Sequence, residues 1–97
     1  MTKLIFEWDS EKSNNNLHKH GVSFEEAMSV WNDEFAAFLH DPVHSVDEDR
    51  YIMIGYSQKN NLIFVSFTER KNKIRIISSR KATKYERKRH EENSKKY

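Results

Sequence analysis

Residues 50–81 read RYIMIGYSQKNNLIFVSFTERKNKIRIISSRK, and this stretch decides the fold. It holds three runs rich in apolar and β-branched residues, over 51–56, 62–68 and 74–79, separated by short polar segments. Runs of this kind with tight connections predict β-strands that pair antiparallel as a meander. The middle run is almost continuously apolar, which is typical of a strand in the centre of a sheet.

The first twenty residues predict a strand and a helix. Residues 3–8 alternate loosely between apolar and polar side chains, which favours a strand. A side-chain oxygen of Asp9 or Ser10 can cap a helix over 11–19, and Gly21 suits the positive φ that ends a helix. Three consecutive asparagines inside that helix are expected to lower its stability.

A second helix is predicted directly afterwards. Ser23 and Glu26 have the spacing of a capping box, in which each side chain bonds the backbone of the other residue. An apolar stripe at helical spacing is expected to pack in the core, and it consists of Phe24, Ala27, Met28 and Trp31.

The remaining elements complete an α+β pattern. Residues 35–40 predict a short strand that Asp41-Pro42 ends, and residues 43–49 predict a loop. Thr83 and Glu86 form a second capping box, which opens a weakly packed helix from Lys84 to about Asn93. The order β-α-α-β-β-β-β-α over residues 1–97 predicts a single small domain, with two N-terminal helices and a C-terminal helix beside an antiparallel sheet.

Composition excludes several classes of protein. The chain has no cysteine, so it contains no disulfide, no thiolate zinc site and no cysteine nucleophile. No apolar run approaches the ~20 residues of a membrane-spanning helix. The N-terminus reaches acidic residues too early for a signal peptide. The absence of cysteine makes a reducing cytoplasm the expected location. The glycine-rich phosphate loops, the nucleophile elbow and the HExxH zinc motif are all missing.

Charge is divided unevenly between the two halves. Residues 1–49 carry 3 lysines and 11 acidic residues, a net charge of −8, whereas residues 50–97 carry 14 basic and 4 acidic residues, a net charge of +10. Such asymmetry is typical of a surface for nucleic acid or for an acidic partner. The alternative is that the two halves fold together and partly neutralise each other.

Charged residues cluster at the ends of the last two predicted strands. Glu69, Arg70, Arg75, Arg80 and Lys81 are expected to share one patch, because these strands are neighbours in the meander. The register is open, since Glu69 can lie opposite residue 74 or 75, and a slip of one residue exchanges the two faces. The alternative is an exposed cluster of ion pairs, worth ~0–1 kcal/mol each.

The histidines do not predict a metal site. His18 and His20 are two residues apart and point away from each other on a helix. His40 and His44 flank Asp41-Pro42 and could hold a metal from a loop, but nothing nearby in the sequence completes the coordination.

The sequence resembles the BrnT toxins of bacterial type II toxin–antitoxin systems over almost its whole length. The specific blocks are KHGVSFEEA at 19–27 and RIISSRKAT at 75–83, with FEWD at 6–9, NLH at 16–18, DRY at 49–51, IG at 54–55, TER at 68–70 and ER at 86–87. Ser79 is a mild departure, because a smaller residue, often alanine, is usual there.

The resemblance implies a RelE-like fold and a ribonuclease toxin that cuts RNA and so inhibits translation and growth. It implies inhibition by a BrnA-like antitoxin with a ribbon–helix–helix DNA-binding part, in a complex with two copies of each protein. Operator DNA would be bound only through the antitoxin. From the residues themselves we expect no metal, no other cofactor and no membrane.

Metal-independent RNA cleavage needs a base for the 2′-OH, cations for the phosphorane and an acid for the leaving oxygen. Glu69 is our candidate for the base, and His20 or His40 are the competing candidates. Arg70 and Arg80 suit a phosphate clamp, because guanidinium donates paired hydrogen bonds, and Arg50 can join them.

Further residues are candidates for binding the RNA. Lys81, Lys84 and Arg87 can position its backbone, and Lys12 and Lys19 are further candidates from the family pattern. The bases could stack on aromatic side chains, for which the candidates are Tyr51, Tyr85 and Trp8. For each aromatic residue, packing in the core is the competing interpretation.

Two other classes of function fit the same residues. A non-catalytic module could use the basic half to bind nucleic acid, with strong salt dependence and no cleavage. A protein-interaction domain could use it to bind an acidic partner.

Overall fold

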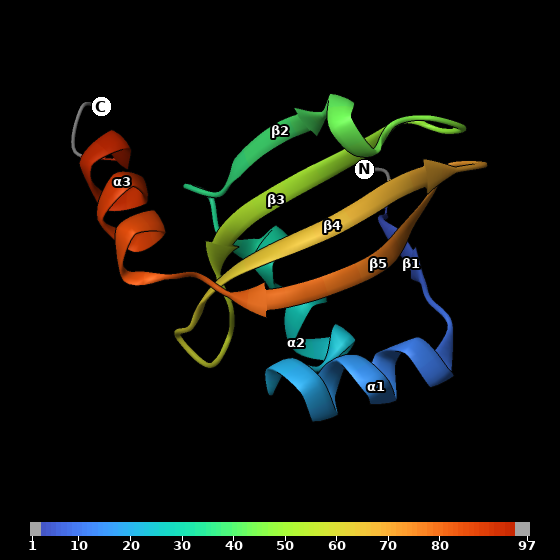
Figure 1. Ribbon diagram of the computed structural model, residues 1–97, viewed down its shortest axis with the longest axis horizontal. Helices are drawn as coiled ribbons and strands as arrows, with labels where there is room; N and C mark the ends of the chain where they lie inside the picture. Colours follow the sequence, from blue (N-terminus) through green and yellow to red (C-terminus); the bar gives the residue numbers. More distant parts are fainter. Residues whose placement is uncertain (1–2, 95–97) are drawn as a thin grey trace.

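The fold is a five-stranded sheet with helices packed on one face (Figure 1). The computed structural model describes residues 3–94. In chain order its elements are β1 (Ile5–Glu7), α1 (Ser10–His20), α2 (Phe24–Met28), η1 (Ser29–Asn32), β2 (Ala37–Asp41), η2 (Pro42–His44), β3 (Arg50–Tyr56), β4 (Leu62–Arg70), β5 (Lys73–Lys81) and α3 (Lys84–Ser94). The predicted order of helices and strands is confirmed, and two short 3-10 helices, η1 and η2, are added to it. Within residues 3–94, every helix is too short or too polar to cross a membrane.

The sheet is mixed, with the strand order β1-β5-β4-β3-β2. β2, β3, β4 and β5 pair antiparallel in sequence order, as the meander pattern predicts. β1 instead pairs parallel to β5, with Ile5 opposite Lys73 and Glu7 opposite Arg75, so a purely antiparallel sheet was the wrong prediction. The alternation in a short edge strand reports burial but not direction, and β1 is free to join the far edge because two helices separate it from β2.

A tight turn fixes the register of β4 and β5. Lys71 and Asn72 have φ angles of 50° and 67°, which is the left-handed pair that a two-residue type I′ hairpin turn requires. Glu69 therefore lies opposite Ile74, one of the two registers that the sequence left open. A bulge between Ser66 and Phe67 shifts the rest of the pairing.

The core lies between the helices and one face of the sheet. Helix residues and strand residues meet there, namely Val22, Phe24, Ala27 and Val30 with Ile63, Val65 and Ile76. The predicted stripe is only partly correct, because Met28 is 37 % exposed while Val30 is fully buried. α2 tightens into η1 at Ser29, and three residues per turn bring Val30 under the sheet.

Glu26 does not complete its capping box. Ser23 Oγ accepts a hydrogen bond from the Glu26 amide at 3.0 Å, as predicted. The Glu26 carboxylate is buried, and its Oε2 accepts from Ser57 Oγ at 2.6 Å and from Asn61 Nδ2 at 2.9 Å. The side chain therefore anchors the β3–β4 turn to α2 instead of closing the helix start.

Asn16 stabilises α1 instead of weakening it. Asp9 and Gly21 cap the helix as predicted. The Asn16 side chain is buried, and its Nδ2 donates to Val22 O, Ser79 O and Ser79 Oγ at 2.8–2.9 Å, while its Oδ1 accepts from Ser79 N at 3.1 Å. The hydroxyl of Ser79, the departure from the family pattern, is thus a partner that ties β5 to α1.

α3 stands away from the sheet, beyond the start of β4 and the end of β5 (Figure 1). Its capping box is complete, because Thr83 N donates to Glu86 Oε1 at 2.8 Å and Glu86 N donates to Thr83 Oγ1 at 3.1 Å. Tyr85 is 67 % exposed, which confirms the weak packing that the sequence predicts. The face of the sheet opposite α1 and α2 is left open.

Candidate functional site

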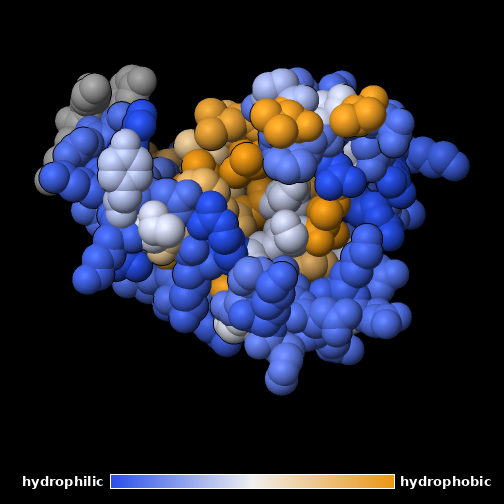
Figure 2. Space-filling view, viewed as in Figure 1, coloured by the Kyte–Doolittle hydropathy of each residue, from blue (hydrophilic) through white to orange (hydrophobic). Residues whose placement is uncertain are grey.

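The open face of the sheet carries a hollow of about 270 Å³, which we call the central hollow. Figure 2 looks onto this face and shows pale and apolar residues surrounded by hydrophilic ones. The floor is formed by residues of β3, β4 and β5, including Ile52, Phe64, Ser66, Ile77 and Ser78. The polar side chains around it come from α1, from the end of β2 with η2, from β3 and from β5, and they are His20, Asp41, His44, Arg50 and Arg80.

Asp41 and His44 form a close pair beside the hollow. His44 Nδ1 lies 2.8 Å from Asp41 Oδ2, because η2 turns the chain back by one helical turn after Pro42. The hydrogen bond from His44 lowers the pKa of Asp41 below its ordinary value of 3.8. A carboxylate in this position fixes which ring nitrogen carries the proton.

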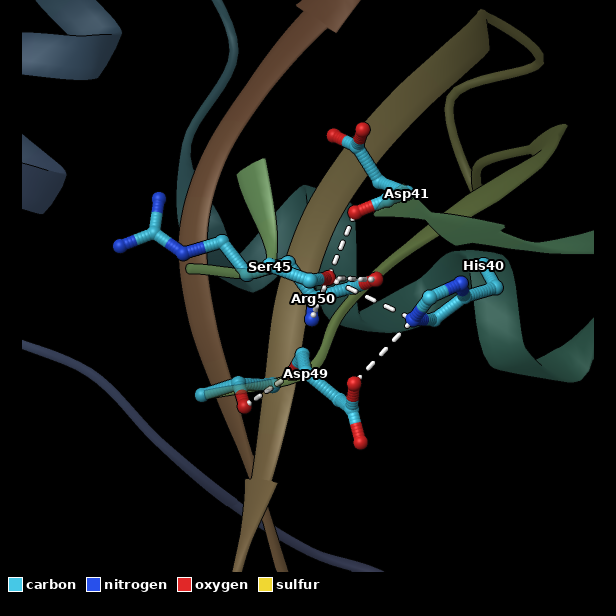
Figure 3. A network of polar contacts seen from close by, with 6 residues as sticks. His40, Asp41, Ser45, Asp49 and Arg50 are labelled. Atoms are coloured by element: carbon cyan, nitrogen blue, oxygen red, sulfur yellow. Dashed lines mark hydrogen bonds and ion pairs between the residues drawn. The ribbon is translucent and has the colours of Figure 1, made fainter. Parts of the chain in front are cut away.

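A second set of contacts fixes the backbone of Arg50 (Figure 3). Ser45 Oγ donates to Asp41 O at 2.6 Å and accepts from Arg50 N at 2.8 Å. His40 Nε2 lies 3.2 Å from Asp49 Oδ1. These contacts join the end of β2 to the start of β3, so the position of Arg50 is set by both strands.

The guanidinium of Arg50 is available for a ligand. Figure 3 shows it pointing away from the cluster of polar contacts. Within residues 3–94 this side chain makes no hydrogen bond or ion pair, and its charge acts electrostatically on Glu48. An unpaired guanidinium beside a hollow is suited to bind phosphate oxygens in pairs.

Arg80 lines the same hollow but already has a carboxylate partner. Its Nη1 and Nη2 donate to Glu86 Oε1 and Oε2 at 2.8 and 2.9 Å, and its guanidinium lies 4.5 Å from the centre of the Phe64 ring. The bond from Arg80 lowers the pKa of Glu86 from 4.5 to about 2, so the pair is ionised at neutral pH. In this conformation Arg80 is therefore not free to clamp a phosphate.

Glu69 and Arg70 do not join Arg80, so the expected single patch is wrong. In the register of β4 and β5, Glu69 lies opposite Ile74 whereas Arg80 lies opposite Phe64. Glu69 is five positions along β4 from Phe64, which corresponds to about 17 Å of extended strand. Glu69 and Arg70 sit at the tip of the hairpin, where Arg70 Nε and Nη2 donate to Glu48 at 3.0 and 2.9 Å. The expectation fails because the ends of β4 and β5 lie at opposite ends of their hairpin.

The other candidates fall outside the lining of the hollow. Lys81, Lys84 and Arg87 are exposed where β5 gives way to α3, and Lys12 and Lys19 are exposed on α1. Tyr51 lies on the helix-covered side, stacked on Phe38 at 5.2 Å, with His40 opposite it in the sheet. Trp8 packs edge-on against Phe24 in the core. Tyr85 is the exposed aromatic residue of the three candidates.

Sequence reasoning missed the Asp41–His44 pair as acid–base chemistry. The signal is present, because His44 follows Asp41 by three residues across Pro42, but at the sequence level His44 is a candidate only for binding a metal. In residues 3–94 no three His, Asp or Glu side chains come together in a way that could hold a metal ion. The structure therefore places His20, Arg50 and Arg80 of the predicted set together, and adds Asp41 and His44.

Comparison with known proteins places this chain in a family. A family model described as the ribonuclease toxin BrnT of type II toxin–antitoxin systems matches residues 8–86. The crystal structure of the ribonuclease toxin BrnT of Brucella abortus is similar, with a TM-score of 0.63 and 25 % sequence identity over 84 % of this chain and 100 % of that chain. A search of curated proteins finds no match.

Proposed function

This chain belongs to the BrnT family of ribonuclease toxins of type II toxin–antitoxin systems, and from that premise we propose that it cuts RNA in the central hollow. The observation that carries the proposal is that two histidines and an unpaired arginine, His20, His44 and Arg50, line one hollow. These are the groups that RNA cleavage through its own 2′-OH requires without a metal. The resulting loss of RNA would inhibit translation and growth.

In the mechanism that we propose, His44 is the base. Its Nδ1 faces the Asp41 carboxylate at 2.8 Å, and this contact favours the proton on Nδ1 and leaves Nε2 able to accept the 2′-OH proton. The 2′-oxygen then attacks the phosphorus, and the bond from phosphorus to the 5′-oxygen breaks. Protonated His20 gives its proton to that leaving oxygen, and the products are a 2′,3′-cyclic phosphate and a free 5′-OH.

Arg50 stabilises the charge that develops on the phosphorane oxygens. Its backbone is held by Ser45, so its guanidinium reaches the hollow from a fixed strand end. Glu69, the candidate base from the sequence, lies about 17 Å along β4 from Phe64, the residue opposite Arg80. Glu69 does not line the hollow. Arg70 is likewise assigned no catalytic role.

The antitoxin partner follows from the family, and its finer description is part of our proposal. We propose that it is BrnA-like, carries a ribbon–helix–helix part that binds operator DNA, and forms a complex of two toxins with two antitoxins. Lys81, Lys84 and Arg87 remain candidates for binding the RNA backbone beside the hollow, and Lys12 and Lys19 remain candidates on α1.

The test is cleavage of labelled RNA by the purified chain, with and without EDTA. Replacing His44 by asparagine should lower the rate by ~10²–10⁴-fold, as expected for the loss of a general base. Arg50→Ala should lower it by ~10²–10³-fold, as expected for the loss of a preorganised donor. EDTA should change nothing.

Two matched controls separate chemistry from folding. His18→Asn removes an exposed histidine from the same helical turn as His20, and Arg75→Ala removes an arginine at the far end of β5. Both controls should cleave RNA at the rate of the unmodified chain. Folded His44→Asn and Arg50→Ala proteins with unchanged rates would remove these residues from the mechanism. Salt-sensitive RNA binding with no cleavage would leave a non-catalytic binding module.

A further inference from the structure

The free edge of the sheet at β2 is unusually apolar. Five large hydrophobic side chains on β2 and its flanks are exposed, and we call them the β2 edge surface: Phe35 (66 %), Phe38 (53 %), Leu39 (49 %), Val43 (77 %) and Val46 (86 %). Figure 2 shows apolar residues gathered along the rim above β2 and the turn that follows it. An apolar patch of this extent on a small protein marks an interaction site.

The backbone of β2 is also open to a partner. β2 is the last strand in the sheet order and pairs only with β3 among the strands of residues 3–94. Edge strands are commonly protected by lysines, by a bulge or by a covering loop. Residues 33–46 contain neither lysine nor arginine, and the β2–β3 register of five pairs is unbroken.

A strand added at this edge would contact apolar side chains on both faces of the sheet. Leu39 lies opposite Ile52, which lines the central hollow, whereas Phe38 lies opposite Met53 on the other face of the sheet. A strand added at this edge would place alternate side chains against Leu39 and against Phe38. The apolar flanks, Phe35 before β2 and Val43 after it, extend the contact at both ends.

We propose that an extended segment of the antitoxin pairs with β2 as a sixth strand, with apolar residues at alternate positions and Lys or Arg at its ends. The charge of the chain around β2 favours a basic partner. Residues 20–49 carry eight acidic residues and no Lys or Arg. Glu34 and Asp47, on either side of β2, are exposed and make no ion pair within the described part of the chain.

A second copy of this chain fits the edge poorly, because pairing β2 with β2 would bring the same acidic flanks together. The proposal rests on membership of the toxin family, which supplies the partner, and does not require that the hollow cleave RNA. It also offers a route to inhibition. Asp41 is the last residue of β2 and lines the hollow, so a strand paired with β2 ends beside the candidate site.

The test is binding of the antitoxin encoded in the adjacent reading frame, measured by calorimetry with the full toxin chain. Leu39→Lys and Val43→Lys should each weaken binding at least tenfold, because they place a charge on the apolar edge. Leu17→Lys is the matched control, because Leu17 is 48 % exposed on α1, against 49 % for Leu39, and it should bind like the unmodified chain. Asp47→Lys should weaken binding and reduce its dependence on salt.

Amide hydrogen exchange gives a second readout, which does not depend on any variant. In the complex the amides of residues 37–41 that point away from β3 should become at least tenfold better protected, while those of β1 at the opposite edge should not change. Unchanged protection of β2, or unchanged affinity of both lysine variants, would overturn the proposal. Self-association of the toxin that Leu39→Lys abolishes would also overturn it, because the occupant would then be a second copy.

Measuring RNA cleavage by the free toxin distinguishes the proposal on antitoxin binding at β2 from the proposed ribonuclease activity. Leu39→Lys should cleave RNA like the unmodified chain and should resist inhibition by the antitoxin. A toxin that cleaves no RNA but still loses antitoxin affinity on Leu39→Lys would contradict only the proposed ribonuclease activity.

Discussion

Replacing Glu86 by glutamine should loosen α3, because this carboxylate joins the helix to the sheet and also closes the start of the helix. Glu86 receives two hydrogen bonds from Arg80 and one from the Thr83 amide, all between 2.8 and 2.9 Å. Further contacts between α3 and the sheet involve Tyr56, whose hydroxyl donates to Glu91 at 3.3 Å and whose ring lies 6.1 Å from that of His90.

The size of the effect follows from the pKa of Glu86. Lowering it from 4.5 to about 2 would correspond to ~3 kcal/mol for a pair withdrawn from water. The side chains of Arg80 and Glu86 are 42 % and 22 % exposed, so solvent screening reduces the contribution to about 1–2 kcal/mol. Hydrogen-exchange protection of the α3 amides should therefore fall by about 5–30-fold at pH 7.

The dependence on pH gives the sharper test. A carboxylate whose pKa is lowered by folding stabilises the fold at pH values above about 4.5, and the contribution is lost as the pH falls toward 2. The unmodified chain should therefore lose its advantage over Glu86→Gln between pH 5 and pH 2. The measurement is the ratio of protection factors in α3 for the two proteins at each pH.

The matched control is Glu92→Gln, which makes the same substitution at an exposed position of the same helix. It should leave the exchange of α3 unchanged at pH 7. Equal protection of α3 in Glu86→Gln and the unmodified chain at pH 7 would refute the reasoning. A difference of the same size at pH 7 and pH 2 would show that the ionised pair is not its cause.

Three further predictions concern the core and the site. Asn16→Leu should lower the free energy of unfolding in urea by about 2–3 kcal/mol, because it leaves buried backbone groups of β5 and residue 22 unpaired. Gly55→Ala should destabilise by about 1–3 kcal/mol in the same assay, because a Cβ there would lie 2.9 Å from Ala36 Cβ and from Val30 Cγ1. Glu69→Gln should leave the rate of RNA cleavage within twofold of the unmodified chain, since Glu69 lies at the far end of the hairpin; a loss of 10²-fold would restore it as a candidate base.

The element order could be predicted because local signals agree with one another. Side-chain caps start the helices where the sequence places them, at Asp9, Ser23 and Thr83. Turn residues with positive φ join β4 to β5. Burial of polar side chains could not be predicted in this way, because the partners of Asn16 and Glu26 are 63 and 31–35 residues away in the chain.

The candidate site was predicted only in part for the same reason. His20, Arg50 and Arg80 were chosen by residue type and family pattern, and they do line one hollow. Glu69 is a candidate because it lies near the end of a strand. Closeness to a strand end does not determine whether Glu69 and Arg80 lie at the same end of the hairpin. Asp41 and His44 could be found from a local pattern, since His44 follows Asp41 by three positions.

The sequence by itself determined the family, the order of the elements, the meander and the basic character of its second half, because these depend on neighbouring residues and on composition. Only the tertiary structure decided which charges meet. Antiparallel pairing makes β4 and β5 neighbours, but the last residues of the two strands lie at opposite ends of the hairpin. Arg80 therefore pairs with Glu86, and Arg70 pairs with Glu48. The placement of a charge on a sheet depends on strand direction and register, which are set by turns and packing across the whole chain.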